Sequence, residues 1–260
     1  MAQKRTPLRV VVTGASTGIG LGIALEFLRQ GDRVFLSSRS VHKLRHRDAE
    51  ISEHLQQGNA FLHPADLSKE DDVRSLMRAA AEQLGGLDVL VNNAGIYEGA
   101  SLEQITASHW NRIMALNLDS YLWACQEASE PLKASQGAII NISSDAALRP
   151  SAAHIAYSVS KAAIDMLTRN VARELAPHGV RVNSVQPGFT ETPILQAGGM
   201  SAAEAQVCFA NAATDNPMGR IARVSDITPL VLFLADASKS GYITGQCITI
   251  DGGQRSFATR

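Results

Sequence analysis

The sequence predicts an α/β protein with one doubly wound parallel sheet of about seven strands, flanked by helices on both faces. Three observations predict this class. Short runs rich in Val, Ile and Leu alternate with amphipathic helical segments. The first run leads directly into a glycine-rich turn and a helix. No linker or repeat interrupts the alternation, so residues 1–260 are expected to form a single dinucleotide-binding and catalytic domain.

Seven segments have the apolar, β-branched composition of buried strands. Helical segments lie between them, so the strands should run parallel and be joined by right-handed crossovers. Each strand ends in glycine or polar residues, which suits the ligand-binding edge of such a sheet. The expected strands cover residues 8–12, 34–38, 60–63, 87–91, 138–142, 180–185 and 246–250.

The expected helices have recognisable start and stop signals. The first ends before Gly31, and Ser68 is expected to cap the helix that precedes the glycine pair at 85 and 86. Pro131 is expected to close a long helix that starts before Trp110. Pro229 is tolerable if it falls in the first turn of a helix that begins near Ser225. Further helices are expected over residues 41–57 and after residue 157.

Composition excludes several classes of function. The formal net charge is -1 and no stretch forms a basic face, so neither nucleic acid nor an anionic membrane is an expected partner. Residues 1–6 lead straight into a strand, which leaves no room for a signal peptide. Cys125, Cys208 and Cys247 lack metal or disulfide spacing, and the histidines lack metal-ligand spacing. A cytoplasmic protein with reduced thiols and no metal is expected.

The glycine-rich turn has the spacing Gly14-x-x-x-Gly18-x-Gly20. Glycines let backbone N–H groups approach phosphate oxygens, and the positive end of a helix dipole favours the negative charge. A tight connection without a ligand would use similar residues. The strand before it and the amphipathic helix after it favour a Rossmann-type dinucleotide site.

The end of the second strand holds Ser38 and Arg39. An acidic residue at this place would bind the ribose 2′-hydroxyl of NAD, whereas a guanidinium can pair with the 2′-phosphate of NADP. NADP(H) is therefore favoured over NAD(H). A surface arginine, or one stacked on adenine, is the alternative. The nearby Lys43, Arg45 and Arg47 fit a solvated helix face better than a phosphate site.

Tyr157 and Lys161 lie four residues apart in a segment of helical character, which places both on one face. A tyrosine has an ordinary pKa of about 10, and a nearby cation favours the phenolate. The pair can therefore transfer protons. By itself the pattern also fits a half-buried tyrosine beside a solvated lysine.

The full set of motifs resembles the short-chain dehydrogenase/reductase family, and within it the 3-oxoacyl-carrier-protein reductase-like members. Each motif is weak, but the set spans nearly the whole chain in the family's order. The motifs are Thr13-Gly14-x-x-x-Gly18-Ile19-Gly20, Asp66-Leu67, Asn92-Asn93-Ala94-Gly95, Asn117, Ser144, Tyr157-x-x-x-Lys161, Pro187-Gly188 and Asp251-Gly252-Gly253.

The resemblance implies a catalytic set of four residues. Tyr157 would exchange the proton with a carbonyl or alcohol oxygen, and Ser144 would hydrogen-bond that oxygen. Lys161 would bind the nicotinamide ribose and lower the Tyr157 pKa, while Asn117 would hold a water that relays protons to Lys161. Ser143 is an alternative to Ser144, and Asn117 could instead cap a kink in its helix.

The resemblance also implies the cofactor-binding residues. These would lie along the pyrophosphate, the adenosine and the nicotinamide end, although Asp66 could belong mainly to a turn. They are Gly14, Ser16, Gly18, Ile19, Gly20, Ser38, Arg39, Asp66, Leu67, Asn93, Tyr157, Lys161, Gly188, Thr190 and Thr192.

Three positions depart from the family pattern. Ser120 stands where glycine is common. Asp145 follows Ser144 where an uncharged residue is usual, so it either faces solvent or lines the substrate pocket and disfavours anions. His154 could touch substrate or simply pack.

Residues 189–216 occupy the place of a mobile substrate lid in this family. The part from Gln196 to Asn216 carries Glu204 and Asp215 but no Lys or Arg, whereas a small carboxylate substrate would want a cationic partner. A neutral or largely apolar ketone or alcohol is expected. A carrier-bound 3-oxoacyl substrate stays open, because its charge lies away from the carbonyl.

The leading interpretation is an NADP-dependent oxidoreductase that acts on a small carbonyl or secondary alcohol, mainly as a reductase. Alternatives are an NAD-dependent alcohol dehydrogenase, a non-catalytic dinucleotide sensor, and an epimerase or dehydratase on the same scaffold. The resemblance also implies a homotetramer with D2 symmetry, built through the helices of Asn117 and Tyr157 and the C-terminal strand region.

Overall fold

The computed structural model describes residues 6–39 and 49–255. Its centre is a seven-stranded sheet in the order β3-β2-β1-β4-β5-β6-β7, in which every pairing is parallel. The α/β doubly wound class is confirmed. The strands are β1 (Arg9–Val12), β2 (Arg33–Ser38), β3 (Ala60–Pro64), β4 (Val89–Asn92), β5 (Ala138–Ile142), β6 (Arg181–Pro187) and β7 (Cys247–Ile250).

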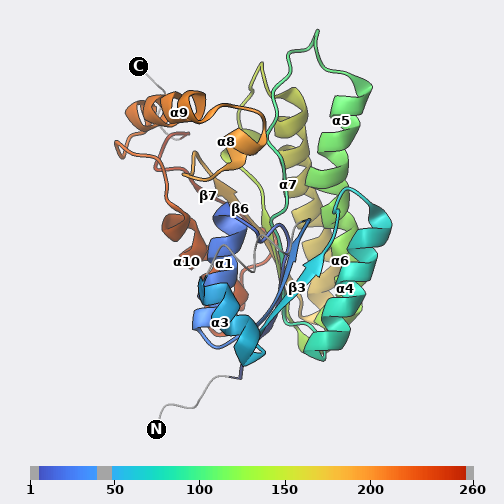
Figure 1. Ribbon diagram of the computed structural model, residues 1–260. Coiled ribbons are helices and arrows are strands. Elements are labelled where there is room, and N and C mark those ends of the chain that lie inside the picture. The colour runs from blue at the N-terminus through green and yellow to red at the C-terminus, as the bar shows by residue number, and fades with distance from the viewer. Residues whose placement is uncertain (1–5, 40–48, 256–260) are drawn as a thin grey trace.

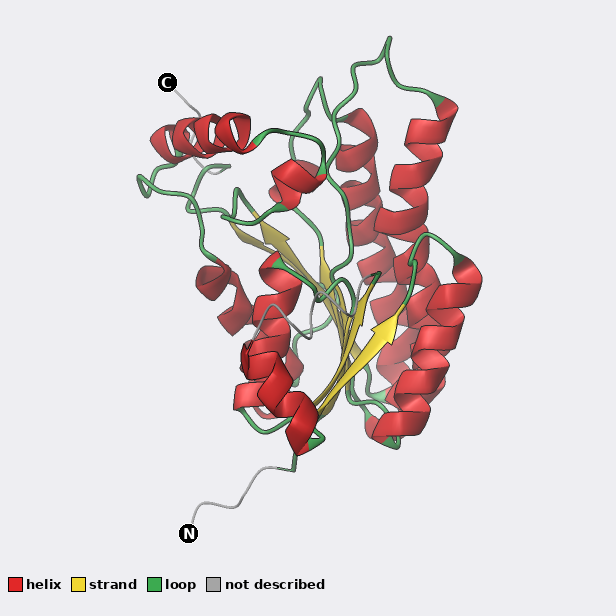
Figure 2. Ribbon diagram, viewed as in Figure 1, coloured by secondary structure: helices red, strands yellow, loops and turns green. Residues whose placement is uncertain are grey.

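Helices cover both faces of the sheet (Figures 1 and 2). One face packs against α1 (Gly18–Arg29), α3 (Ala49–Gln57) and α10 (Val224–Ala235). The other packs against α4 (Glu70–Leu84), α6 (Ser120–Ser135) and α7 (Ile155–Leu175). The remaining helices are α5 (Ala107–Met114), α8 (Ile194–Ala197), α9 (Ala202–Asp215) and α11 (Ala237–Ser240), with short turns η1 (Ala115–Asp119), η2 (Asp145–Ala147) and η3 (Ala176–His178).

The central strands are apolar along their whole length because both of their faces are covered. Val12 of β1 pairs with Leu36 of β2 on one side and with Val91 of β4 on the other, and all three are fully buried. The strand order reverses direction between β1 and β4. A crevice opens at such a switch point, beyond the carboxyl ends of the strands.

The predicted long helix is interrupted by one π-helical segment, η1, between α5 and α6. Asn117 lies in this segment and is fully buried. Its side chain bonds both backbone groups of Ile96, accepting from the nitrogen at 2.9 Å and donating to the oxygen at 3.0 Å. A π turn therefore lies where a kink near Asn117 was considered from the sequence. Single π turns within helices are frequent at functional sites.

Three predicted helix signals are wrong. Helix α4 begins at Glu70, and Ser68 does not cap it. The Ser68 hydroxyl instead donates to Asp66 at 2.8 Å. Pro131 lies inside α6, which continues to Ser135, where the hydroxyl bonds Leu87 O at 2.6 Å and anchors the last turn. Pro229 falls beyond the first turn of α10, inside a helix that buried Ile227, Val231 and Leu234 hold on the sheet.

Other expectations meet the limits of the description. Residues 41–48 of the predicted 41–57 helix, with Lys43, Arg45 and Arg47, lie outside the described residues. The rest of that prediction corresponds to α3. Within the described ranges, each helix is too short or too polar to cross a bilayer.

The buried guanidinium of Arg181 ties β6 to the end of α10. It donates to Leu234 O at 2.6 Å, to Ala235 O at 3.2 Å and to the hydroxyl of Ser240 at 2.9 Å. The last carbonyls of a helix lack donors within the helix, and the Arg181 guanidinium is a donor to two of them here.

We expect Arg181→Met to lower the free energy of unfolding by about 3 kcal/mol, because the Ala235 carbonyl loses its donor and the Leu234 carbonyl keeps only the Ser240 hydroxyl. Urea denaturation followed by circular dichroism measures this. Arg173→Met, at an exposed position of α7, serves as the control and should change stability by less than about 0.5 kcal/mol. Equal losses in both variants would contradict the anchoring role.

Candidate active site

A cleft of about 1020 Å³ runs along the carboxyl ends of the strands. Most of the predicted site residues line it. They are Gly14, Ser16, Gly18, Ile19, Ser38, Arg39, Leu67, Asn93, Ser144, Tyr157, Lys161, Gly188, Thr190 and Thr192. Gly20, Asp66 and Asn117 do not line it, and each lies in supporting structure described below.

The glycine turn after β1 leaves no room for side chains. Gly14 has a φ of +63°, and a Cβ there would lie 2.8 Å from the Cα of Ala94. A Cβ on Gly20 would lie 2.3 Å from Nδ2 of Asn93. That amide donates to Thr13 O at 2.9 Å and Gly14 O at 3.1 Å. Asn93 therefore braces the turn, and the glycines keep its backbone accessible from the cleft.

The residues predicted to bind adenosine differ in exposure and in surroundings. Ser38 is buried, whereas Arg39 is exposed, and both line the cleft. Asp66 instead accepts hydrogen bonds from the amide of Ser68 at 3.2 Å and from its hydroxyl at 2.8 Å. These bonds, more than the distant charge of Arg39, lower the pKa of Asp66. The structure places Asp66 in a turn and leaves its neighbour Leu67 on the wall.

Lys161 is buried beside Tyr157, one turn along α7. Its ammonium donates to Ile142 O at 2.9 Å and lies 5.7 Å from the ring centroids of both Tyr121 and Tyr157. Burial lowers the pKa of Lys161 to about 8, and the charge of Asp165 opposes the shift. At neutral pH, Lys161 is therefore still mostly cationic.

Tyr157 lines the cleft, and its pKa is raised. Burial is the main cause, and the negative charge of Asp145 adds to it. A hydrogen bond from Ser144 works in the opposite direction. Tyr97 meets the Tyr157 ring edge-on, with 4.8 Å between centroids. The phenol is thus held protonated at neutral pH, which is the form that can donate a proton.

The two candidate serines do different things. The Ser144 hydroxyl accepts from the Ala146 amide at 3.1 Å and donates to Asp145 at 3.3 Å, within reach of Tyr157. The Ser143 hydroxyl donates to the backbone oxygen of Lys161 at 3.1 Å. Ser144 therefore faces the phenol, while Ser143 secures helix α7.

Asn117 supports the site from behind. In addition to Ile96, its amide donates to the Ser160 hydroxyl at 3.3 Å. A Cβ on Gly95 would lie 3.4 Å from Oδ1 of Asn117 and 3.6 Å from Nζ of Lys161. The side chains of Asn117 and Lys161 therefore approach the same glycine. Among the described residues, no direct hydrogen bond joins these two side chains.

The loop after β6 closes the opposite wall. Thr190 donates to Gly188 O at 3.0 Å. A Cβ on Gly188 would lie 2.9 Å from Asp251, and a Cβ on Gly18 would lie 3.2 Å from Thr192. This loop therefore passes directly over the glycine turn, which brings both to one groove.

Several lining residues were not predicted from the sequence. Tyr97 stacks on His154 at 4.3 Å, and burial raises its pKa to about 12. Arg149 forms an ion pair with Asp145 at 2.8 Å. Cys208 and Phe209 of α9 face the cleft from above. The spacing of Asp145 and Arg149, four residues apart, was a signal that could have identified the pair.

His154 and Asp145, the departures noted in the sequence, both line the cleft. His154 contacts the Ser151 hydroxyl at 3.1 Å, and burial lowers its pKa. Asp145 is buried, and burial raises its pKa against the effect of Arg149. Ser120 donates to Leu116 O at 2.7 Å within its helix.

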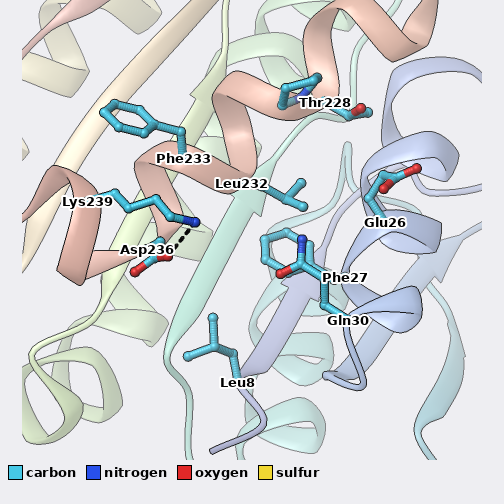
Figure 3. Close-up of a pocket in the computed structure, with 10 residues that line it drawn as sticks. Leu8, Glu26, Phe27, Gln30, Thr228, Leu232, Phe233, Asp236 and Lys239 are labelled. Carbon is cyan, nitrogen blue, oxygen red and sulfur yellow. Dashed lines mark ion pairs between the residues drawn. The ribbon is translucent and has the colours of Figure 1, made fainter. Parts of the chain in front are cut away.

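A second hollow, of about 280 Å³, lies between α1 and α10 (Figure 3). Leu8 borders it, so it lies at the amino end of β1, opposite the cleft. Among the lining residues drawn in Figure 3, Asp236 and Lys239 form an ion pair at 3.0 Å. Ligands of open α/β sheets bind at the carboxyl edge, so the larger cleft is the candidate active site.

Comparison with known proteins identifies the family. A family model described as short chain dehydrogenase matches residues 9–200. The chain is a short-chain dehydrogenase/reductase.

Relatives of this short-chain dehydrogenase/reductase cover almost all of its length. Glucose 1-dehydrogenase of Gluconobacter oxydans is 36% identical over 94% of this chain and 91% of its own. The 3-oxoacyl-[acyl-carrier-protein] reductase of Staphylococcus aureus is 35% identical over 94% of this chain and 96% of its own. A solved family member from Caenorhabditis elegans, of unknown function and with cofactor, has a TM-score of 0.92 at 32% identity, covering 98% of each chain.

Membership establishes the general chemistry of this short-chain dehydrogenase/reductase. It is an NAD(P)-dependent oxidoreductase that moves hydride between nicotinamide and an alcohol or carbonyl of a small molecule. The resemblance that the motifs indicated is confirmed.

We expect Lys161→Met to stabilise this short-chain dehydrogenase/reductase at pH 7. Burial lowers the Lys161 pKa from its ordinary value to about 8, so below pH 8 the charge reduces stability by up to about 3 kcal/mol. Between about pH 8 and pH 10.4 the unfolded chain binds more protons, so wild-type stability rises with pH.

The measurement is the melting temperature of both proteins from pH 7 to pH 10. The variant should melt higher at pH 7, with a difference that shrinks as pH rises through this window. A difference that stays constant with pH would contradict the buried cation.

Proposed function

We propose that this enzyme uses NADP(H) to reduce a carbonyl compound to a secondary alcohol, and runs the reverse reaction at high alcohol, with Tyr157 as general acid/base. One observation carries the proposal. Tyr157, Ser144 and Lys161 line one cleft together with the glycine turn and Arg39. A hydride donor and a proton donor can therefore face one carbonyl group.

The cleft fits a dinucleotide. The tight turn keeps a groove open where a Cβ on Gly14, Gly18 or Gly20 would strike a neighbour. Backbone groups of Gly14, Ser16, Gly18 and Ile19 would meet the pyrophosphate at the start of α1. Leu67 would contact adenine, Asn93 would lie beside a ribose, and Gly188, Thr190 and Thr192 would meet the nicotinamide end. The bound nicotinamide supplies or accepts the hydride.

Proton transfer falls to the residues of α7 and the loop after β5. The protonated Tyr157 phenol would donate to the substrate oxygen as negative charge develops there, and the Ser144 hydroxyl would hydrogen-bond the same oxygen. The Lys161 cation stabilises the phenolate left behind. Asn117 bonds the backbone of Ile96 and the hydroxyl of Ser160, and so positions both. Its further proposed role is to hold a water that relays protons to Lys161.

The preference for NADP rests on the end of β2. No carboxylate stands at Ser38 or Arg39, and Arg39 is an exposed guanidinium on the cleft wall. A guanidinium there supports the binding of a 2′-phosphate, to which it can make paired hydrogen bonds.

The proposal includes a lid at residues 189–216 and a homotetramer. Leu195, Cys208 and Phe209 line the cleft from α8 and α9, which supports a lid over the substrate. Leu122 of α6 and Val159 and Met166 of α7 are exposed apolar side chains, which supports helix pairing between subunits. The free thiols of all three cysteines support a cytoplasmic location.

Arg39→Ala tests the cofactor preference. We expect the wild type to bind NADPH at least tenfold more tightly than NADH, because a charge-assisted pair with the phosphate is lost with NADH. The variant should bind the two about equally, with its NADH affinity little changed. Fluorescence titration of all four combinations measures this. Equal wild-type binding of both cofactors would overturn the NADP assignment.

Tyr157→Phe tests the proton-transfer role. We expect kcat for ketone reduction to fall by about 10³-fold, since general acid catalysis is worth 10² to 10⁴. NADPH binding should remain within about threefold of wild type, because the ring is kept. Steady-state kinetics and titration measure the two effects. Retained turnover in the variant would assign the acid role to another group.

A further inference from the structure

The charge along the cleft is unevenly distributed. Among the described residues that line it, the Asp, Lys and Arg side chains are Arg39, Asp145, Arg149 and Lys161. Arg39 stands at the adenosine end, and Lys161 is buried with its ammonium on Ile142 O. Asp145 and Arg149 therefore supply the charge at the substrate end.

Asp145 and Arg149 form one ion pair beside the catalytic serine. One carboxylate oxygen of Asp145 accepts from the Ser144 hydroxyl at 3.3 Å. The other lies 2.8 Å from a guanidinium nitrogen of Arg149. The Asp145 side chain is 7% exposed and that of Arg149 is 38% exposed, so the cation is the partner that a ligand in the cleft can reach.

The lid adds no charge to this wall. The residues of α8 and α9 that line the cleft are Ile194, Leu195, Gln196, Ala197, Cys208 and Phe209, all uncharged. On the loops after β4 and β5, Tyr97 and His154 are stacked on each other, and burial lowers the pKa of His154, which favours its neutral form. An anionic substrate entering here would depend on Arg149.

We propose that Asp145 determines substrate specificity by neutralising Arg149, so that the site accepts neutral carbonyl compounds and rejects those with a carboxylate near the carbonyl. This inference rests on the proposed function of the same cleft. The lid itself contributes no cation to the cleft. Arg149 does line the cleft, but its charge is already paired with Asp145.

The physical basis is competition for one guanidinium. A free arginine would bind a carboxylate through two parallel hydrogen bonds. Asp145 is tethered four residues away and is present at high effective concentration, so a dissolved carboxylate competes poorly. A carboxylate that did approach Arg149 would also lie close to the Asp145 charge in a partly desolvated cleft, where like charges repel strongly.

Asp145→Asn separates charge from shape. The amide oxygen can still accept from Ser144, while the negative charge on Arg149 is lost. Arg149→Met is the matched control, because it removes the cation and keeps an unbranched side chain. Acetoacetate and acetoacetamide are suitable probes, since they share a ketone and differ mainly in charge.

We expect wild-type enzyme with NADPH to reduce acetoacetamide with at least tenfold higher kcat/KM than acetoacetate. Asp145→Asn should raise the acetoacetate-to-acetoacetamide ratio by about tenfold or more, mainly through KM, which is the effect of one charge-assisted hydrogen bond. Arg149→Met should not raise the ratio. The double variant should lose the gain of Asp145→Asn.

An unchanged ratio in Asp145→Asn, a gain in Arg149→Met, or a gain that survives in the double variant would overturn the inference. The same ratio is measurable without turnover, as relative binding of the two probes to the enzyme–NADP⁺ complex by saturation-transfer NMR. If neither ketone is reduced, the proposed function fails for these compounds, while the binding ratio still decides the role of Asp145. Melting temperatures check that each variant is folded.

Discussion

The buried cation of Lys161 is the interaction on which the candidate active site of this protein depends. Transferring an ammonium out of water is costly unless hydrogen bonds and nearby charges compensate. Here the carbonyl of Ile142, at the end of β5, accepts a hydrogen bond from the ammonium, and the rings of Tyr121 and Tyr157 flank the cation. Asp165 supplies a favourable charge one turn further along α7. Helix and strand are thereby held in one register.

The buried face of α7 is consequently polar where most buried helix faces are apolar. Tyr157, Lys161 and Asp165 recur at intervals of four, and all three are buried. Asp165 accepts from Ser184 at 3.0 Å and also from Gln186, both on β6. A single helix face thus joins the proposed proton donor, the cation and the sheet. Rigid attachment of this kind is what a proton-transfer geometry needs, because small displacements are costly in rate.

The sequence predicted those parts of the molecule that depend on local pattern. Strands, the glycine turn and the Tyr157–Lys161 spacing are set by neighbours in the chain, and they were found at about the expected places. Pro131 was misjudged because a distant carbonyl, that of Leu87, anchors the turn beyond it. Ser68 was misjudged because Asp66 competes for its hydroxyl. Neither a tertiary anchor such as Leu87 nor a local side-chain competitor such as Asp66 leaves a periodic signal in the sequence.

The candidate site divides in the same way. The half proposed to bind the cofactor follows motifs with fixed spacing, whereas the half proposed to bind the substrate is assembled from loops. Tyr97 and Arg149 join it only because the loops after β4 and β5 fold over the same strand ends. Asp66 shows the opposite case, since a motif residue is drawn into a turn while Leu67 lines the cleft. Loop side chains are free to vary without disturbing the sheet, so their partners cannot be read from pattern.

The π turn of η1 fixes the length of the chain between α5 and α6. An α-helix advances about 100° per residue, so a π turn holds one residue more than the regular helix would need. Deleting one residue from 115–119 would restore regular hydrogen bonding and leave α5 and α6 on their present faces, because the wide turn absorbs the extra residue. Ile113 would stay in the core, but the turn that brings the side chain of Asn117 to the backbone of Ile96 would be lost. The extra residue therefore serves the position of Asn117 and not the packing of the helix.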